Sequence, residues 1–140
     1  MDSVSNQETF LDSAAYRQKF MEQDALSRHL GISLDEVRPG YAKATLVVTP
    51  TLLNGVGVTH GGAVFTLADI VLAAASNSHG TSALGLNVNI SYMKATRTGE
   101  TLTAIAREEK MTRKIGFYRM EVRDSTQDLV AVAEGMVYRK

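Results

Sequence analysis

The 140-residue chain contains no cysteine, and its fifteen basic residues are matched by fifteen acidic ones. The lack of cysteine excludes disulfides, cysteine-ligated metals and a thiol nucleophile, and it fits a reducing, intracellular setting. The balanced charge provides no net field that would attract nucleic acid or an anionic membrane. We therefore expect no nucleic-acid partner, and any binding site has to be argued from local features.

The chain also lacks a long uninterrupted apolar run. Its longest apolar stretch, residues 63–75, is interrupted by Thr66 and Asp69, whereas a membrane span needs about 20 mostly apolar residues. The beginning of the chain, MDSVSNQETF, has neither the basic start nor the apolar core of a signal peptide. These absences predict a cytoplasmic protein without a membrane anchor, and the length suits a single domain over residues 1–140.

Two segments carry helical patterns. Between residues 10 and 30 apolar side chains recur loosely among polar ones, which predicts one or two short helices in an N-terminal segment of residues 1–30. From Gly61 to about Ser78 the chain is apolar nearly all round, and a helix of this kind belongs at the centre of a fold. Gly80 is the expected stop signal.

Several segments show β-branched or alternating patterns. They are residues 41–49, 84–92, 100–111, 115–123 and 129–138. Residues 84–92 alternate most cleanly between large apolar and small or polar side chains, which predicts that one face of this strand is buried. One long helix followed mainly by antiparallel strands predicts an α+β fold in which a single sheet wraps the helix.

Asp69 stands in the middle of the apolar helix. Its neighbours on both sides are apolar, which leaves little room for this turn to face solvent, and an unpaired buried carboxylate is costly. A carboxylate in an apolar cleft suits an acid, a base or a nucleophile. The alternative is a structural ion pair or a cap on another element, because ion-pair networks also keep charges buried.

A glycine-rich segment precedes this helix. His60, Gly61 and Gly62 bring backbone N–H groups to a helix start, where such groups can stabilise an oxyanion. Asn54 in the same loop could orient a water or a carbonyl, although asparagine before glycine is common in plain turns. His60 is equally ambiguous, since a histidine here can simply bond to the loop backbone.

The spacing between Gly61 and Asp69 bears on assembly. The two residues are eight positions apart, so about 12 Å of helix axis separates them, and they cannot flank one carbonyl within one subunit. If both act on one substrate, the helix start of one chain must meet the middle of another chain's helix, as a two-fold dimer permits. The spacing therefore predicts a site at a subunit interface.

The stretch from Asn54 to Gly80 resembles the signature region of hotdog-fold acyl-CoA thioesterases of the phenylacetyl-CoA thioesterase-like family. The matched positions are Asn54, His60, Gly61, Gly62, Phe65, Leu67, Ala68, Asp69, Asn77, Ser78 and Gly80. The element order agrees over nearly the whole chain. The resemblance implies a five-stranded antiparallel sheet wrapped around a long central helix, with self-association into dimers that share a continuous sheet and often into tetramers.

The resemblance also implies hydrolysis of an acyl-CoA, with an aryl or medium-chain acyl group, without a metal or organic cofactor; coenzyme A is part of the substrate. Asp69 would attack the thioester carbonyl or activate a water, and the Gly61 N–H would bind the oxyanion. Asn54 would position the water or the carbonyl, while His60 would mainly order the loop. An ordinary aspartate, with a pKa of about 3.9, is ionised at neutral pH unless burial raises that value strongly.

Further residues are candidates for substrate binding. They are Gly62, Phe65, Asn89, Arg113 and Lys114. Phe65, with Leu72 and Tyr92, could line an acyl pocket, although large apolar residues on such elements are more often core. Arg113 and Lys114 lie on a turn that could reach the phosphates of coenzyme A, or could form a solvated hairpin tip.

Two positions depart from the family pattern. Met93-Lys94-Ala95 stands where many relatives have an arginine and a proline, and Gly85 stands where several have a hydroxyl, so no catalytic hydroxyl is assigned. A non-catalytic acyl-CoA-binding module on the same fold is the alternative function, although the intact set of Asn54, Gly61 and Asp69 argues against it. A hotdog dehydratase fits poorly, because those enzymes usually combine a histidine and a carboxylate in another arrangement.

Overall fold

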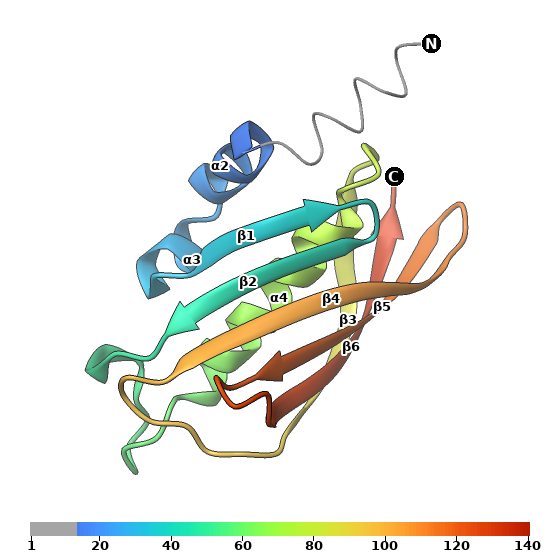
Figure 1. Ribbon diagram of the computed structural model, residues 1–140. Helices are drawn as coiled ribbons and strands as arrows, with labels where there is room; N and C mark the ends of the chain where they lie inside the picture. The colour runs from blue at the N-terminus through green and yellow to red at the C-terminus, as the bar shows by residue number, and fades with distance from the viewer. Residues whose placement is uncertain (1–13) are drawn as a thin grey trace.

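The computed structural model describes residues 14–140 (Figure 1). Its elements are α2 (Ala14–Gln23), α3 (Ala25–Leu30), β1 (Ser33–Arg38), β2 (Tyr41–Val47), the 3-10 helix η1 (Pro50–Leu52), α4 (Gly61–Ser76), β3 (Ala83–Tyr92), β4 (Thr101–Met111), β5 (Ile115–Arg123) and β6 (Leu129–Arg139). The predicted strands and the long helix are confirmed. The predicted N-terminal helices are present from residue 14 onward, and residues 10–13 of that prediction lie outside the described residues.

The strands form one antiparallel sheet in the order β1-β2-β4-β5-β6-β3. Figure 1 shows the sheet curving around α4, with α2 and α3 beside β1. The helix contacts every strand of the sheet, most extensively β2 and β4. The α+β prediction, a long helix wrapped by an antiparallel sheet, is therefore confirmed.

The helix α4 begins and ends where the sequence indicates. His60 is its N-cap residue, and Gly80, which follows the last turn, has a φ of +83°, a conformation that a side chain disfavours. The helix contains 16 residues. Within residues 14–140, no helix combines the length and apolar character required to cross a membrane.

The strand β1 is missing from the sequence prediction, so the sheet has one strand more than the five expected. Its residues SLDEVR bury only Leu34 and Val37. A bulge between Leu34 and Glu36 interrupts its pairing with β2, and a bulge destroys the alternation by which a strand is recognised. A short edge strand with a bulge thus leaves little periodic signal.

The strand β3 forms the other edge, and the prediction that one of its faces is buried is wrong in the protomer. A bulge after Gly85 shifts its register against β6. Leu84 and Leu86 are consequently exposed, and only Val88 and Ile90 pack partly against the core. A one-residue shift moves a side chain to the opposite face of a sheet, so the alternation in the sequence does not correspond to one buried face.

The core lies between α4 and the inner face of the sheet. Leu67, Val71 and Leu72 of the helix are buried there. The helix can approach β6 closely because position 135 is a glycine: a Cβ on Gly135 would lie 2.6 Å from Leu72 Cδ2 and 3.2 Å from Met120 Cε. Gly135 therefore sets how near the helix lies to the sheet.

Replacing Gly135 by alanine should destabilise the fold. Leu72 and Met120 are both fully buried, and overpacking of a core costs about 1–3 kcal/mol. Urea denaturation should show this loss in the free energy of unfolding for Gly135→Ala. The control is Gly55→Ala, at a loop position where an added Cβ would meet no atom within 4 Å, which should change the same quantity by less than about 0.5 kcal/mol. Equal stability of the two variants would contradict this role of Gly135.

Candidate functional site

The start of α4 presents an unpaired backbone donor. The Nδ1 atom of His60 accepts a hydrogen bond from the Gly62 N–H at 2.8 Å, so the Gly62 amide is already paired. The Gly61 N–H lies in the first turn and has no acceptor within the helix, and no group of residues 14–140 accepts from it. Gly61 therefore offers a donor at the positive end of the helix dipole.

A cavity of about 450 Å³ lies beside Gly61. Residues lining it include Asn54, Gly61, Val64, Tyr92, Lys94 and Thr96. They come from the loop before α4, from α4 itself, from the end of β3 and from the loop after β3. The volume is in the range of about 300–1,000 Å³ that is common for small-molecule sites. The structure thus brings the predicted residues Asn54 and Gly61 together in one cavity.

The side-chain oxygen of Asn54 stabilises a turn, whereas its NH2 group has no partner among residues 14–140. Its Oδ1 accepts hydrogen bonds from the N–H groups of Val56, at 3.0 Å, and Val58, at 3.2 Å. This is the usual behaviour of asparagine in a turn. Its Nδ2 donates to no group among residues 14–140. The loop contacts therefore occupy the oxygen and leave the nitrogen able to donate to a molecule in the cavity.

Two buried threonines hold the loops around the cavity together. The Thr59 N–H donates to the Thr96 carbonyl at 2.9 Å, and Thr96 Oγ1 donates to Thr59 Oγ1 at 2.7 Å. Both residues are buried, where an unmade hydrogen bond would be costly. This pair fixes the loop before α4 against the loop after β3.

Lys94 anchors the loop after β3 to the turn between β5 and β6. Its Nζ lies 2.6 Å from Asp124 Oδ2 and 3.0 Å from Asp128 Oδ2. The hydrogen bond from Lys94, followed by the one from Thr126, holds the pKa of the buried Asp124 well below its usual range. The sequence marks Lys94 only as a departure from the family pattern, because a partner 30 residues away leaves no local signal.

Asp69 lies on the face of α4 that the sheet does not cover. The residues on either side of it, Ala68 and Ile70, are buried, but its own side chain is exposed in the protomer. The expectation of a buried carboxylate is therefore wrong for the protomer, because the sheet covers the helix from one side only. No lysine, arginine or histidine of residues 14–140 pairs with Asp69. Asp69 therefore forms no structural ion pair with another of residues 14–140, which was the alternative role predicted for it.

Two effects raise the pKa of Asp69 above that of an ordinary aspartate. Although its carboxylate reaches solvent, the surrounding protein removes part of its hydration, and this desolvation is the larger effect. The negative charge of Asp24 is the smaller one. Asp24 is the N-cap residue of α3, where it accepts a hydrogen bond from the Ser27 N–H. A carboxylate with a raised pKa takes up a proton more readily, which suits a general base.

The other candidate residues on α4 and β3 are not gathered at the cavity. Phe65 is partly exposed, one turn before Asp69 on the uncovered side of the helix. Leu72 is buried in the core. Asn89 projects from the outer face of β3, where its Nδ2 donates to Asn87 Oδ1. The structure therefore brings neither Leu72 nor Asn89 to the cavity of the same protomer.

Arg113 and Lys114 lie on the exposed turn between β4 and β5. This turn is at the opposite end of β4 from Thr96 and the cavity. The Lys114 Nζ lies 5.6 Å from the centre of the Tyr138 ring. Within one protomer, Arg113 and Lys114 therefore form a solvated hairpin tip, the second of the two predicted alternatives. They lie away from Gly61 and its cavity.

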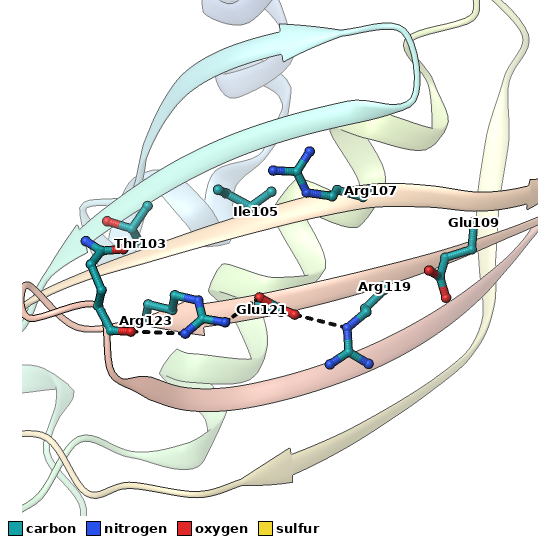
Figure 2. A pocket seen from close by; sticks show the side chains of 8 residues that line it. Thr103, Ile105, Arg107, Glu109, Arg119, Glu121 and Arg123 are labelled. Carbon is teal, nitrogen blue, oxygen red and sulfur yellow. Dashed lines mark hydrogen bonds and ion pairs between the residues drawn. The ribbon is translucent and has the colours of Figure 1, made fainter.

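A separate hollow of about 220 Å³ lies on the outer face of β4 and β5 (Figure 2). Glu121 forms ion pairs there with Arg123, at 2.8 Å, and Arg119, at 3.1 Å, and these two hydrogen bonds lower the pKa of Glu121. The Arg107 guanidinium lies 5.1 Å from the centre of the Tyr41 ring. Arg119, Glu121 and Arg123 of this hollow thus pair with one another on the strand β5. Residues 14–140 contain no group of three His, Cys, Asp or Glu side chains placed to hold a metal ion.

Comparison with known proteins gives consistent results at the level of sequence. Residues 56–131 match the thioesterase superfamily. A protein of Archaeoglobus fulgidus named as a candidate esterase is 46% identical over 118 residues, which cover 84% of this chain and 77% of that protein. The acyl-coenzyme A thioesterase PaaI of Escherichia coli is 36% identical over 118 residues, or 84% of each protein.

Solved structures show the same relationship. The E. coli PaaI protein, from the phenylacetic acid degradation operon, has a TM-score of 0.85 at 34% identity over 88% of this chain and 89% of its own. A Streptococcus mutans protein bound to acetyl CoA has a TM-score of 0.75 at 28% identity over 78% of this chain and 88% of its own. The chain therefore belongs to the thioesterase superfamily, with the hotdog fold, and is a homologue of the acyl-CoA thioesterase PaaI.

Proposed function

We propose that this protein hydrolyses acyl-CoA thioesters with aryl or medium-chain acyl groups to a free acid and coenzyme A. The observation that carries the proposal is the unpaired Gly61 N–H at the start of α4, beside a cavity that Asn54 also lines. The similarity to PaaI, an acyl-CoA thioesterase, supports the reaction. The similarity to the S. mutans protein that binds acetyl CoA supports the class of substrate.

In the proposed reaction the thioester oxygen accepts a hydrogen bond from the Gly61 N–H as negative charge develops on it. Asp69 acts in one of two ways. It removes a proton from a water that attacks the carbonyl carbon, or it attacks that carbon itself and forms an anhydride that water then cleaves. In both routes the carbon–sulfur bond breaks and the thiolate of coenzyme A takes up a proton. Asn54 positions the water or the carbonyl, and His60 orders the loop.

The reacting carbonyl is placed between two protomers. The helix α4 is continuous from Gly61 to Ser76, so Gly61 and Asp69 of one protomer stay about 12 Å apart along its axis. The edge of β3, with Leu84 and Leu86 exposed, offers backbone hydrogen-bonding groups and apolar surface to a second chain. Two such strands paired about a two-fold axis would continue the sheet and put both helices on one face. Dimers, or tetramers made of two dimers, fit this arrangement.

The same pairing gives Arg113 and Lys114 a role. Their turn lies beside the start of β3, since the Arg139 N–H donates to the Lys114 carbonyl and the Lys140 N–H donates to the Ser82 carbonyl. Antiparallel pairing of two β3 strands would bring the start of one strand toward the end of the other. Arg113 and Lys114 would then approach the cavity of the partner, where they can bind the phosphates of coenzyme A.

Substitution of Asp69 by asparagine should remove hydrolysis. The amide keeps the shape of the side chain but can neither accept the proton of a water nor form the anhydride, so the rate should fall by at least about 10²-fold. The measurement is release of free thiol from a panel of acyl-CoAs. Asp35→Asn, at an exposed carboxylate of β1, should retain the wild-type rate. Full activity of Asp69→Asn would contradict the role of Asp69, and a wild type inactive on every thioester would contradict the proposed function.

Two inactive variants should complement each other if the site is shared. Gly61→Pro removes the N–H donor at a helix position that proline favours, and the preceding His60 has the extended backbone, φ −61° and ψ 134°, that proline requires. Co-expression of Gly61→Pro and Asp69→Asn chains, each inactive alone, should yield hybrid dimers with one intact site. With random pairing, about one quarter of the wild-type activity should return.

Differently tagged chains allow the hybrids to be purified and assayed separately. Hybrids as inactive as either parent would place Gly61 and Asp69 in the same protomer's site and would contradict the shared arrangement. Gly61→Pro adds a Cβ that would lie 3.2 Å from Tyr92 Cζ, so circular dichroism and gel filtration of each variant are needed as folding controls.

The pH profile should report the raised pKa of Asp69. The ionised carboxylate is the active form, so kcat/KM should fall on acidification, beginning at a higher pH than an ordinary aspartate would give. Asp24→Asn removes the like charge but keeps a good N-cap residue, so the acid limb should move to lower pH. Profiles measured from about pH 4 to about pH 8 would show this shift. If Asp35→Asn moves the acid limb by the same amount as Asp24→Asn, the acid limb reports a group other than Asp69.

A further inference from the structure

The hydroxyl of Tyr92 contacts the start of α4. Tyr92 is the last residue of β3, and its partner across the sheet is the buried Ala131 on the inner face. Its Oη donates a hydrogen bond to the Gly61 carbonyl at 3.0 Å. The side chain is 53% exposed, so the fold does not need it as core. The accessible phenol of Tyr92 thus lies at the cavity and is hydrogen-bonded to Gly61, the residue that carries the unpaired N–H.

The absence of a side chain at position 61 permits this contact. A Cβ on Gly61 would lie 3.2 Å from Tyr92 Cζ and 3.3 Å from its Oη. Both distances are shorter than ordinary contacts, so any larger residue would push the ring away. Gly61 is not among the glycines of this chain that have a positive φ, and its backbone conformation would therefore accept a side chain. A glycine is therefore needed at position 61 because the Tyr92 ring lies so close, and not because the backbone there has an unusual angle.

The end of β3 is a rigid base for this contact. The N–H groups of Met93 and Lys94 both donate to the Val130 carbonyl, at 2.8 and 3.3 Å. The Lys94 ammonium is in turn anchored to Asp124. The backbone that carries Tyr92 is therefore fixed to β6 and to the β5–β6 turn, and a side chain on a fixed element can hold its target in place.

We propose that Tyr92 is a positioning residue for the oxyanion donor at Gly61, an inference that rests on the proposed function. The first turn of a helix lacks part of its hydrogen bonding and frays. A bond from Tyr92 to the Gly61 carbonyl restrains the same residue whose N–H points to the substrate. Oxyanion stabilisation depends on donors that are already in place before the reaction. The tyrosine acts through Gly61, on the rate of the chemical step rather than on substrate binding.

The test is Tyr92→Phe, which removes the hydroxyl and keeps the ring. We expect kcat for acyl-CoA hydrolysis to fall about 3- to 10-fold, the effect of one neutral hydrogen bond, while KM changes less than about 2-fold because ground-state binding is kept. The control is Tyr138→Phe, at an exposed phenol on the outer face of β6, which should leave both constants unchanged. The thermal midpoints of the two variants should agree.

A second readout does not depend on activity. Amide hydrogen exchange at Ala63 and Val64, whose N–H groups donate to the His60 carbonyl in the first turn, is followed by NMR. It should be faster in Tyr92→Phe than in wild type or Tyr138→Phe, because the first turn opens more often. An unchanged kcat with unchanged exchange, in a wild type that hydrolyses acyl-CoA, would overturn the role of Tyr92 and leave the proposed function standing. A raised KM with an unchanged kcat would also overturn it. If the wild type hydrolyses no acyl-CoA, the proposed function fails, and the exchange rate alone decides whether Tyr92 fixes Gly61.

Discussion

The packing of α4 against one face of the sheet is the constraint on which the other features depend. The helix is apolar enough to be buried on all sides, yet the sheet covers it from one side, and Gly135 lets it lie close to β6. The start of the helix and the stripe that carries Phe65 and Asp69 stay uncovered. An unpaired N–H and a carboxylate with a raised pKa are thereby held on one rigid element, too far apart to act on the same atom.

Contacts between distant segments then shape the cavity at the helix start. The Thr59–Thr96 hydrogen bonds join the loops on its two sides, and the Lys94–Asp124 ion pair fixes one of these loops to the turn between β5 and β6. These interactions lie outside the residues proposed to take part in the chemistry. They nevertheless decide where Asn54 and Tyr92 stand relative to Gly61, because each restrains a loop that has little regular structure of its own.

Two features of the protomer support the proposed dimer. The β3 edge exposes backbone hydrogen-bonding groups and two leucines, and long exposed edges favour pairing with another strand. Asp69 is exposed and without a cation partner in residues 14–140, although it lies among buried apolar neighbours. Both features are understandable if a second chain covers this side of the molecule. The wrong expectation of a buried Asp69 arises from treating the helix as fully enclosed within one chain.

Local patterns were sufficient for most elements, and they failed where a bulge interrupts the alternation. The central helix and the strands other than β1 have clear periods or clear boundaries. The strand β1 has only two buried side chains and a bulge, and the bulge after Gly85 puts Leu84 on the opposite face of β3 from Val88 and Ile90. The same register explains why Asn89, a predicted substrate contact, lies on the outer face. Alternation identifies a strand, but the pairing with its neighbour decides which face each residue occupies.

The sequence by itself determined the α+β architecture, the apolar helix with Asp69 at its middle, and the glycine at its start eight positions earlier. Their separation follows from helix geometry alone. Only the tertiary structure decided that Tyr92 bonds to Gly61, 31 residues away, that Lys94 pairs with Asp124, and that Asp69 lies on the uncovered side. The physical reason is that helix spacing is a local property, whereas contacts between distant residues depend on strand register and on how closely the helix packs on the sheet.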